Sequence, residues 1–213
     1  MRTRILKAFL ISLLTLAVFF PAVPAHAENP VPAAAPLTIS SSLPAFSDFV
    51  AAVTDGSAGV VRGVYVPNLF AYKVVQQPSG KDAYVSGTKN VVTQFRMAAQ
   101  YDVVGLLAHN YLAGASFSSL KVGQEVRLVY GDGQVAYYKI TLIASYQAVS
   151  PSSASSDFID LATNKTYTAT QIFNQYYTGE THLTFQTCVA KDKEPSWGRL
   201  FIVAEPDETR SGK

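Results

Sequence analysis

The residue with the most distinctive chemistry is Cys188, the only cysteine in the 213-residue sequence. It ends the β-prone run Leu183-Thr184-Phe185-Gln186-Thr187-Cys188. A single cysteine cannot close an internal disulfide. In an exported protein it is a buried residue with no chemical role, an intermolecular disulfide partner or a reactive thiol. We favour the reactive thiol, because the cysteine thiolate is a strong nucleophile for acyl chemistry.

A reactive thiol needs a partner that exchanges its proton, and histidine is a common one. After the first 27 residues the sequence offers His109 and His182. His182 lies six residues before Cys188, which on a regular strand gives a shared face but a separation of about 20 Å. His109 follows the apolar run 103–108, where a fold can present it to a residue far away in sequence. We therefore expect His109 to be the partner of Cys188. His182 is expected to be a surface residue, or a core residue whose ring nitrogens are hydrogen-bonded.

Acyl transfer also needs a group that stabilises the developing oxyanion, and a fixed guanidinium can do this. Arg199 opens the β-prone run 200–204, which is the run that follows Cys188. If the two runs pair as a hairpin with a long loop, Arg199 and Cys188 lie at facing ends of neighbouring strands. The alternative is an exposed arginine at the end of a strand. The other arginines considered, Arg62, Arg96 and Arg127, have no comparable link to Cys188.

A mainly β structure is expected to position these residues, because tyrosine and phenylalanine are abundant and only 15% of residues are charged. The sequence Gly131-Asp132-Gly133 is a strong hairpin signal. Strands that follow one another through such turns favour a closed or nearly closed, antiparallel-rich barrel with short helices inserted between strands. We expect strands at 60–66, 69–75, 83–86, 103–108, 126–130, 135–143, 181–188 and 200–204; helices at 43–53, 90–100 and 168–177; and loops at 111–120, 150–156 and 189–198.

The first 27 residues have the pattern of an export signal. Arg2, Arg4 and Lys7 precede an apolar run of 13 residues, and Ala25-His26-Ala27 resembles a cleavage site. The run is shorter than the roughly 20 residues that span a bilayer, so a retained membrane anchor is the less favoured alternative. We expect a cleavable signal peptide and a protein secreted or held outside the cytoplasmic membrane.

The remaining chain divides into a Pro/Ala/Ser-rich lead-in at 28–42, one domain at 43–206 and a polar tail at 207–213. Signal removal takes three of the 17 basic residues and leaves 14 against 15 acidic residues, a net charge near −1. That balance argues against nucleic acid as a partner. No cluster of His and Cys has the spacing of a zinc site, so we expect no metal and no cofactor.

Two parts of the sequence together resemble the sortase family. The run that ends in Cys188, with Arg199 eleven residues later, resembles the Thr-Leu-x-Thr-Cys … Arg signature of sortases. In that signature Phe185 stands where Leu is usual. The segment around His109 resembles the family's histidine-containing segment, with Ala108 where Gly often precedes the histidine. The residues that carry the second match are Gly105-Leu106-Leu107-Ala108-His109-Asn110, Phe117, Leu120, Gly123 and Val126.

The resemblance implies an eight-stranded sortase β-barrel and a cysteine transpeptidase that cleaves a sorting-type motif, commonly Leu-Pro-x-Thr-Gly. It implies that Cys188 is the nucleophile, that His109 protonates the leaving amine, and that Arg199 orients the substrate and stabilises the oxyanion. Thr187 would line the substrate site, and the segment 148–180 would shape substrate choice. The partners would be a protein carrying the motif and an amine acceptor from the cell wall or another protein, acting on a monomeric enzyme.

Two other functions fit the same residues. A thiol hydrolase would pass the acyl group to water instead of an amine. A non-catalytic barrel would bind peptide or cell-wall material and would keep its function in Cys188→Ala.

Overall fold

The computed structural model describes residues 43–153 and 155–210. The expected signal peptide and lead-in lie outside these residues. Within the described part of the chain, no helix is long and apolar enough to cross a membrane. The described part of the expected tail turns back, and Asp207 N–H donates to the Tyr137 carbonyl.

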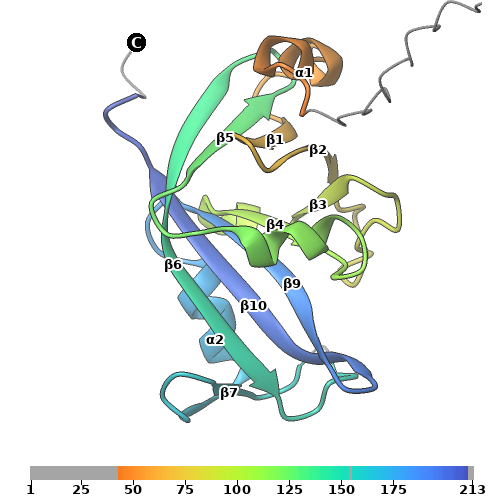
Figure 1. Ribbon diagram of the computed structural model, residues 1–213, viewed down its shortest axis with the longest axis vertical. Helices are drawn as coiled ribbons and strands as arrows, with labels where there is room; N and C mark the ends of the chain where they lie inside the picture. Colours follow the sequence, from red (N-terminus) through yellow and green to blue (C-terminus); the bar gives the residue numbers. More distant parts are fainter. Residues whose placement is uncertain (1–42, 154, 211–213) are drawn as a thin grey trace, which may run out of the picture. The chain divides into compact units, whose positions relative to one another are not determined.

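Eight strands close into a barrel, as predicted (Figure 1). The ring runs β10-β9-β4-β3-β2-β1-β5-β6, and pairing of β6 with β10 closes it. Neighbours are antiparallel except for β2 with β3 and β4 with β9, which are parallel. The strands are β1 (Val61–Val66), β2 (Phe70–Gln76), β3 (Val91–Phe95), β4 (Val104–Ala108), β5 (Glu125–Tyr130), β6 (Val135–Ala148), β9 (Leu183–Lys191) and β10 (Glu194–Pro206), with β7 (Phe158–Asp160) and β8 (Thr166–Tyr167) extending the sheet beyond β6.

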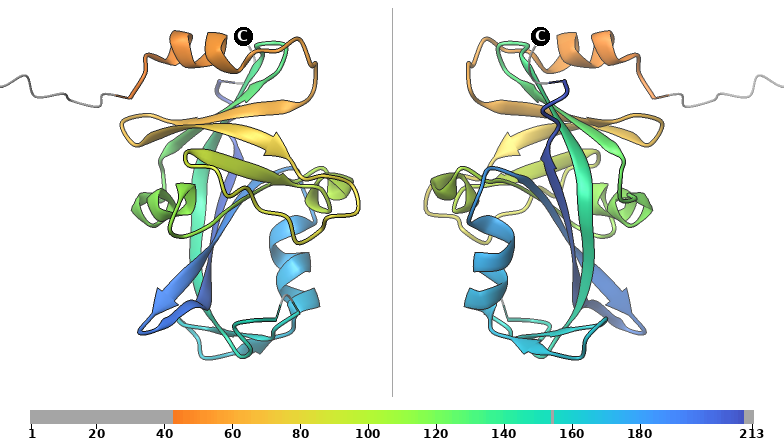
Figure 2. Two further views of the ribbon diagram at one scale, coloured as in Figure 1. Left: turned by 90° about the vertical axis from the view of Figure 1, so that its right-hand side faces the viewer. Right: turned by 90° about the vertical axis from the view of Figure 1, so that its left-hand side faces the viewer.

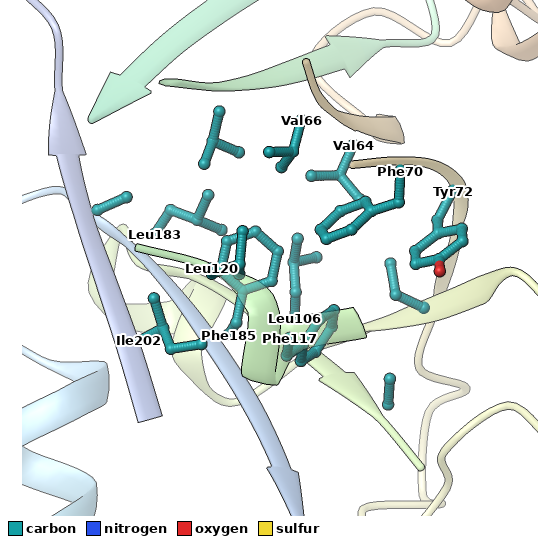
Figure 3. Close-up of a cluster of buried hydrophobic side chains, with 14 of the residues drawn as sticks. Val64, Val66, Phe70, Tyr72, Leu106, Phe117, Leu120, Leu183, Phe185 and Ile202 are labelled. Atoms are coloured by element: carbon teal, nitrogen blue, oxygen red, sulfur yellow. The ribbon is translucent and has the colours of Figure 1, made fainter. Parts of the chain in front are cut away.

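The barrel interior is filled by apolar side chains from strands far apart in sequence (Figure 3). Alternate residues of a strand point to opposite faces, so each strand contributes every second side chain. On β9 the inward residues Leu183 and Phe185 are fully buried. The same alternation sends Gln186 and Cys188 to the outer face. Other labelled members of the interior cluster are Val64, Val66, Phe70, Tyr72, Leu106, Phe117, Leu120 and Ile202.

Two helices cover different parts of the barrel (Figure 2). The helix α1 (Phe46–Val53) packs Phe49 and Val53 against β1 and β5. The helix α2 (Ala169–Tyr177) lies towards the opposite end and packs on the outer face of β6 and β10. Thr168 and Gln171 form a capping box that fixes the start of α2, as expected of a threonine before the first helical residue.

Three expectations about local structure were wrong. Residues 90–100 form β3 and a short 3₁₀ helix, η1 (Ala98–Tyr101), because β-branched residues at its start pair with both β2 and β4. Residues 83–86 form no strand, since the side chain of Gln77 donates to the carbonyls of Asp82 and Tyr84 and holds this segment as a loop. Residues 189–198 are mostly strand, because β9 and β10 extend as a hairpin beyond the barrel.

The expected loop at 111–120 also contains regular structure. A 3₁₀ helix, η2 (Ala113–Ser119), places Phe117 in the barrel core. The strand expected at 135–143 continues to Ala148 as β6. Of these two elements, η2 approaches β9 most closely where Gly114 meets Thr187, the residue before Cys188.

Candidate active site

Strand register brings Cys188, His109 and Arg199 onto neighbouring strands. In the antiparallel pair β9–β10, Cys188 lies directly opposite Arg199. In the parallel pair β4–β9, Ala108 lies beside Thr187. The next residues are His109, just past the end of β4, and Cys188 on β9. Adjacent strands are typically about 4.8 Å apart, so side chains at these positions can meet on one face.

All three residues line one pocket of about 350 Å³. The pocket lies on the outer face of the barrel wall, between β4, β9, β10 and α2. Apart from the three residues it is mainly apolar and aromatic, with walls from Phe95, Phe158, Ile172, Phe173, Tyr177 and Phe201. A pocket with this lining suits an uncharged segment of peptide.

His109 is held by its neighbours in sequence. Its ring stacks on Tyr111, with ring centroids 5.2 Å apart and an angle of 19° between the planes. The side-chain amide of Asn110 donates to the Pro195 carbonyl at 2.9 Å, which ties this segment to the β9–β10 hairpin. Within the described residues no hydrogen bond joins His109 to Cys188. Hydrogen bonds between catalytic groups often form only when substrate binds.

Arg199 is anchored by main-chain oxygens. Its Nη1 donates to the carbonyls of Ser196 and Gly198, both at 2.9 Å, and its Nη2 donates to the Pro151 carbonyl at 3.4 Å. These bonds use three of the five guanidinium N–H groups, which leaves two for a ligand within the described structure. The result is a positive charge held at the pocket beside Cys188.

Thr187, the residue expected to line the substrate site, borders the pocket but directs its hydroxyl elsewhere. The side chain is buried and donates to the Ala108 carbonyl at 2.9 Å. Gly114 of η2 lies so close to it that a Cβ at position 114 would overlap the Thr187 hydroxyl. This contact joins β9, β4 and η2 directly beneath His109 and Cys188.

His182 lies away from this pocket, in agreement with the expectation that it is not the partner of Cys188. It is buried, and its ring nitrogens lie 2.7 Å from the Glu180 carbonyl and 3.0 Å from the Tyr176 carbonyl. It borders a different hollow of about 530 Å³ at the start of β9.

A polar pair that the sequence analysis did not single out forms part of the pocket wall. The Tyr177 hydroxyl donates to the side-chain carbonyl of Gln186 at 2.5 Å. Burial raises the pKa of Tyr177 well above its usual value, so the phenol stays neutral and remains a donor. The signal that could have found Gln186 is its position two residues before Cys188, which puts both on one face of the strand.

Among the described residues, no group of three or more His, Cys, Asp or Glu side chains is arranged to hold a metal ion. The pocket therefore offers the thiol of Cys188, the imidazole of His109, the guanidinium of Arg199 and the amide of Gln186, while the Asp82 carboxylate at its edge is paired with Arg96.

No protein-family model matches the sequence, and no curated protein matches it. Solved structures similar to this one include sortase A from Listeria monocytogenes, with 14% identity and a TM-score of 0.44 over 70% of this chain and 88% of that one. They also include a lid mutant of Corynebacterium diphtheriae sortase A, with 10% identity and a TM-score of 0.46 over 69% of each chain. Streptococcus suis sortase C1 has 12% identity and a TM-score of 0.45 over 75% of this chain and 76% of that one. At such low identities, the chemistry of this chain has to be judged from its own pocket.

Proposed function

We propose that this protein is a sortase-type cysteine transpeptidase that works outside the cytoplasmic membrane. One observation carries the proposal: Arg199 lies opposite Cys188 on one neighbouring strand, His109 directly follows the other, and all three line one pocket. The motif resemblance around Cys188 and His109 supports the same assignment.

In the first half of the proposed reaction, the Cys188 thiolate attacks the carbonyl carbon of a peptide bond in a sorting-type motif. A C–S bond forms, and the carbonyl electron pair moves to oxygen. The free N–H groups of Arg199 then stabilise that oxyanion. Collapse re-forms the carbonyl and breaks the C–N bond, while the His109 imidazolium gives its proton to the leaving nitrogen.

In the second half, an amine attacks the thioester carbon and His109 accepts the proton that the amine loses. The C–S bond breaks, its electron pair returns to sulfur as thiolate, and a new amide bond leaves the enzyme. Atoms and charge balance over the two halves, so the reaction needs no cofactor. The acceptor would be an amine of the cell wall or of another protein, and the export signal at residues 1–27 would deliver the enzyme to it.

The test uses a degenerate peptide pool, incubated with the enzyme with and without a short glycine peptide as amine acceptor, and read by mass spectrometry. We expect a thioacyl adduct on Cys188 and an amide product that requires the amine. Cys188→Ala should abolish both. His109→Ala should lower the rate about 10²- to 10⁴-fold, and Arg199→Ala about 10²- to 10³-fold. Arg127→Ala is the control, because Arg127 stacks on Phe46 of α1, away from the pocket.

Three results would contradict the proposal in different ways. Product release at an equal rate without amine indicates a thiol hydrolase on the same residues. No adduct with any peptide, together with no alkylation of Cys188 by iodoacetamide, indicates a non-catalytic barrel. An alkylation rate that is unchanged in His109→Ala removes His109 from its proposed role.

A further inference from the structure

We propose that Gln186 is a specificity residue, which selects substrates that carry an uncharged hydrogen-bond acceptor on a side chain close to the cleaved bond. The inference rests on the proposed function and adds the substrate class. Amide and hydroxyl side chains are the groups that meet this description.

Gln186 is in the right place to read the acyl part of a substrate. It lies two residues before Cys188 on β9 and borders the same pocket. Two residues of strand span about 7 Å, which is about the separation of next-but-one side chains on one face of an extended peptide. A peptide whose carbonyl carbon meets the Cys188 sulfur therefore places a nearby side chain at Gln186.

Tyr177 fixes the orientation of the Gln186 amide. Its side chain is 3% exposed, and its hydroxyl needs an acceptor because a buried O–H without one is costly. The side-chain oxygen of Gln186 supplies that acceptor at 2.5 Å. Phe95 and Phe173 pack against the Tyr177 ring, with centroids 5.1 Å and 5.6 Å away, and hold it in place.

The consequence is a directed donor in an apolar pocket. With its oxygen occupied by Tyr177, Gln186 offers its Nε2–H₂ group, which has no hydrogen-bond partner among the described residues. Among the described residues, the buried side-chain atoms without a hydrogen-bond partner are Arg62 Nε and Arg96 Nε. Gln186 Nε2 is not one of them, so part of its surface is accessible to solvent. An apolar side chain bound against it would leave the donor desolvated and unpaired, at a cost of about 1–3 kcal/mol.

The surroundings favour a neutral acceptor over a charged one. The Tyr177 hydroxyl contacts Gln186, and the rings of Phe95 and Phe173 and the side chain of Ile172 line the same pocket. Burying a carboxylate against these groups would be far more costly than burying an amide or a hydroxyl, because the guanidinium of the pocket, that of Arg199, lies opposite Cys188 whereas Phe201 lies opposite Gln186. A site built to hydrogen-bond a polar group rejects the apolar isostere much more strongly than an apolar pocket rejects a polar one.

The experiment starts from the best wild-type substrate of the peptide pool. Each of the two residues before the cleaved bond is replaced in turn by the matched pairs Asn/Leu and Thr/Val, and kcat/KM is measured for each peptide. At one of the two positions we expect the wild type to prefer the acceptor-bearing member by about tenfold or more. Gln186→Leu should remove or reverse this preference and keep turnover of the apolar member.

Two further variants separate the donor from general packing. Tyr177→Phe keeps Gln186 but releases its amide, so the preference should fall by a few fold without reversing. Gln175→Leu is the matched control, because Gln175 contacts the Tyr146 and Tyr176 hydroxyls and borders the other hollow. It should leave the preference unchanged. Iodoacetamide labelling of Cys188 in each variant checks that the site is intact.

The inference is overturned if the wild type shows no preference at either position, or if Gln186→Leu keeps it. An equal decrease in kcat/KM for all peptides in Gln186→Leu also overturns it, because that pattern indicates that Gln186 contacts the peptide main chain. These outcomes leave the transpeptidase proposal standing. Absence of any adduct and of any labelling at Cys188 would remove both.

Discussion

His109 depends on Tyr111 for its orientation at the pocket edge. The two rings are stacked, and the Tyr111 side chain is 72% exposed, so it has no other evident structural task. Its neighbour Asn110 is bonded to the β9–β10 hairpin, which limits the movement of the backbone here. The imidazole is therefore positioned by an aromatic contact, while the main chain is positioned by a hydrogen bond.

Tyr111→Ala should consequently lower kcat/KM about three- to tenfold, because an aromatic pair is worth about 0.5–1.5 kcal/mol. Tyr111→Phe keeps the ring and should behave like the wild type. The measurement is the pH–rate profile of all three proteins with one peptide: loss of positioning changes the height or the apparent pKa values of the profile. An unchanged profile for Tyr111→Ala would show that the stack is incidental.

The short helix η2 acts as a spacer between the ends of β4 and β9. Gly114 N–H donates to the His109 carbonyl at 3.0 Å, and Phe117 of the same element fills the barrel core. A side chain at position 114 would overlap the Thr187 hydroxyl and the carbonyls of Ala108 and His109. The close approach of η2 to the two strands therefore requires a glycine.

Gly114→Ala should reduce the free energy of unfolding by about 1–3 kcal/mol, the usual cost of forcing an added carbon into a packed site. It should also lower the transpeptidation rate, because the displaced atoms belong to the residues next to His109 and Cys188. Gly87→Ala is the matched control, since a Cβ there would meet nothing within 4 Å. Urea unfolding and peptide turnover measured together test this, and equal stability of the two variants would contradict it.

For the whole molecule, buried tyrosines make the fold sensitive to alkali. Burial raises the pKa of Tyr138, in the barrel core, to about 12, and it raises the pKa of Tyr176 and Tyr177 further. An unfolded tyrosine ionises near pH 10. The folded state thus holds on to phenolic protons that the unfolded state loses, so stability is fully present below pH 10 and falls as the pH rises above it.

Urea unfolding at intervals from pH 8 to 12 should therefore show a level region followed by a steady fall above pH 10. Each buried tyrosine can add up to about 1.4 kcal/mol per pH unit to the slope. Tyr138→Phe should make the slope shallower, whereas Tyr111→Phe, at an exposed position, should leave it unchanged. A level profile through pH 12 would contradict the assignment of these phenols as buried and neutral.

Local pattern in the sequence was enough for several parts of this protein. The β-prone runs predicted most barrel strands, the helix expected at 168–177 is α2, and the order of residues around Cys188 and Arg199 predicted their pairing across a hairpin. These features depend on interactions within a few residues or across one turn, so the local sequence pattern predicts them. Local pattern wrongly predicted a helix at 90–100, because pairing of β3 with β2 on one side and β4 on the other keeps the start of this segment extended.

Tertiary structure decided how the pocket is assembled. His109 lies beside Cys188 because β4 and β9 pair in parallel, a contact that the Thr187 hydroxyl reinforces across 79 residues of sequence. Gln186 gains its proposed role only because α2 places Tyr177 against it. Both depend on which strands and helices bury their apolar faces together, and that choice is made by the barrel core as a whole. The sequence by itself therefore determined which side chains are available for chemistry, and the closed barrel determined which of them meet.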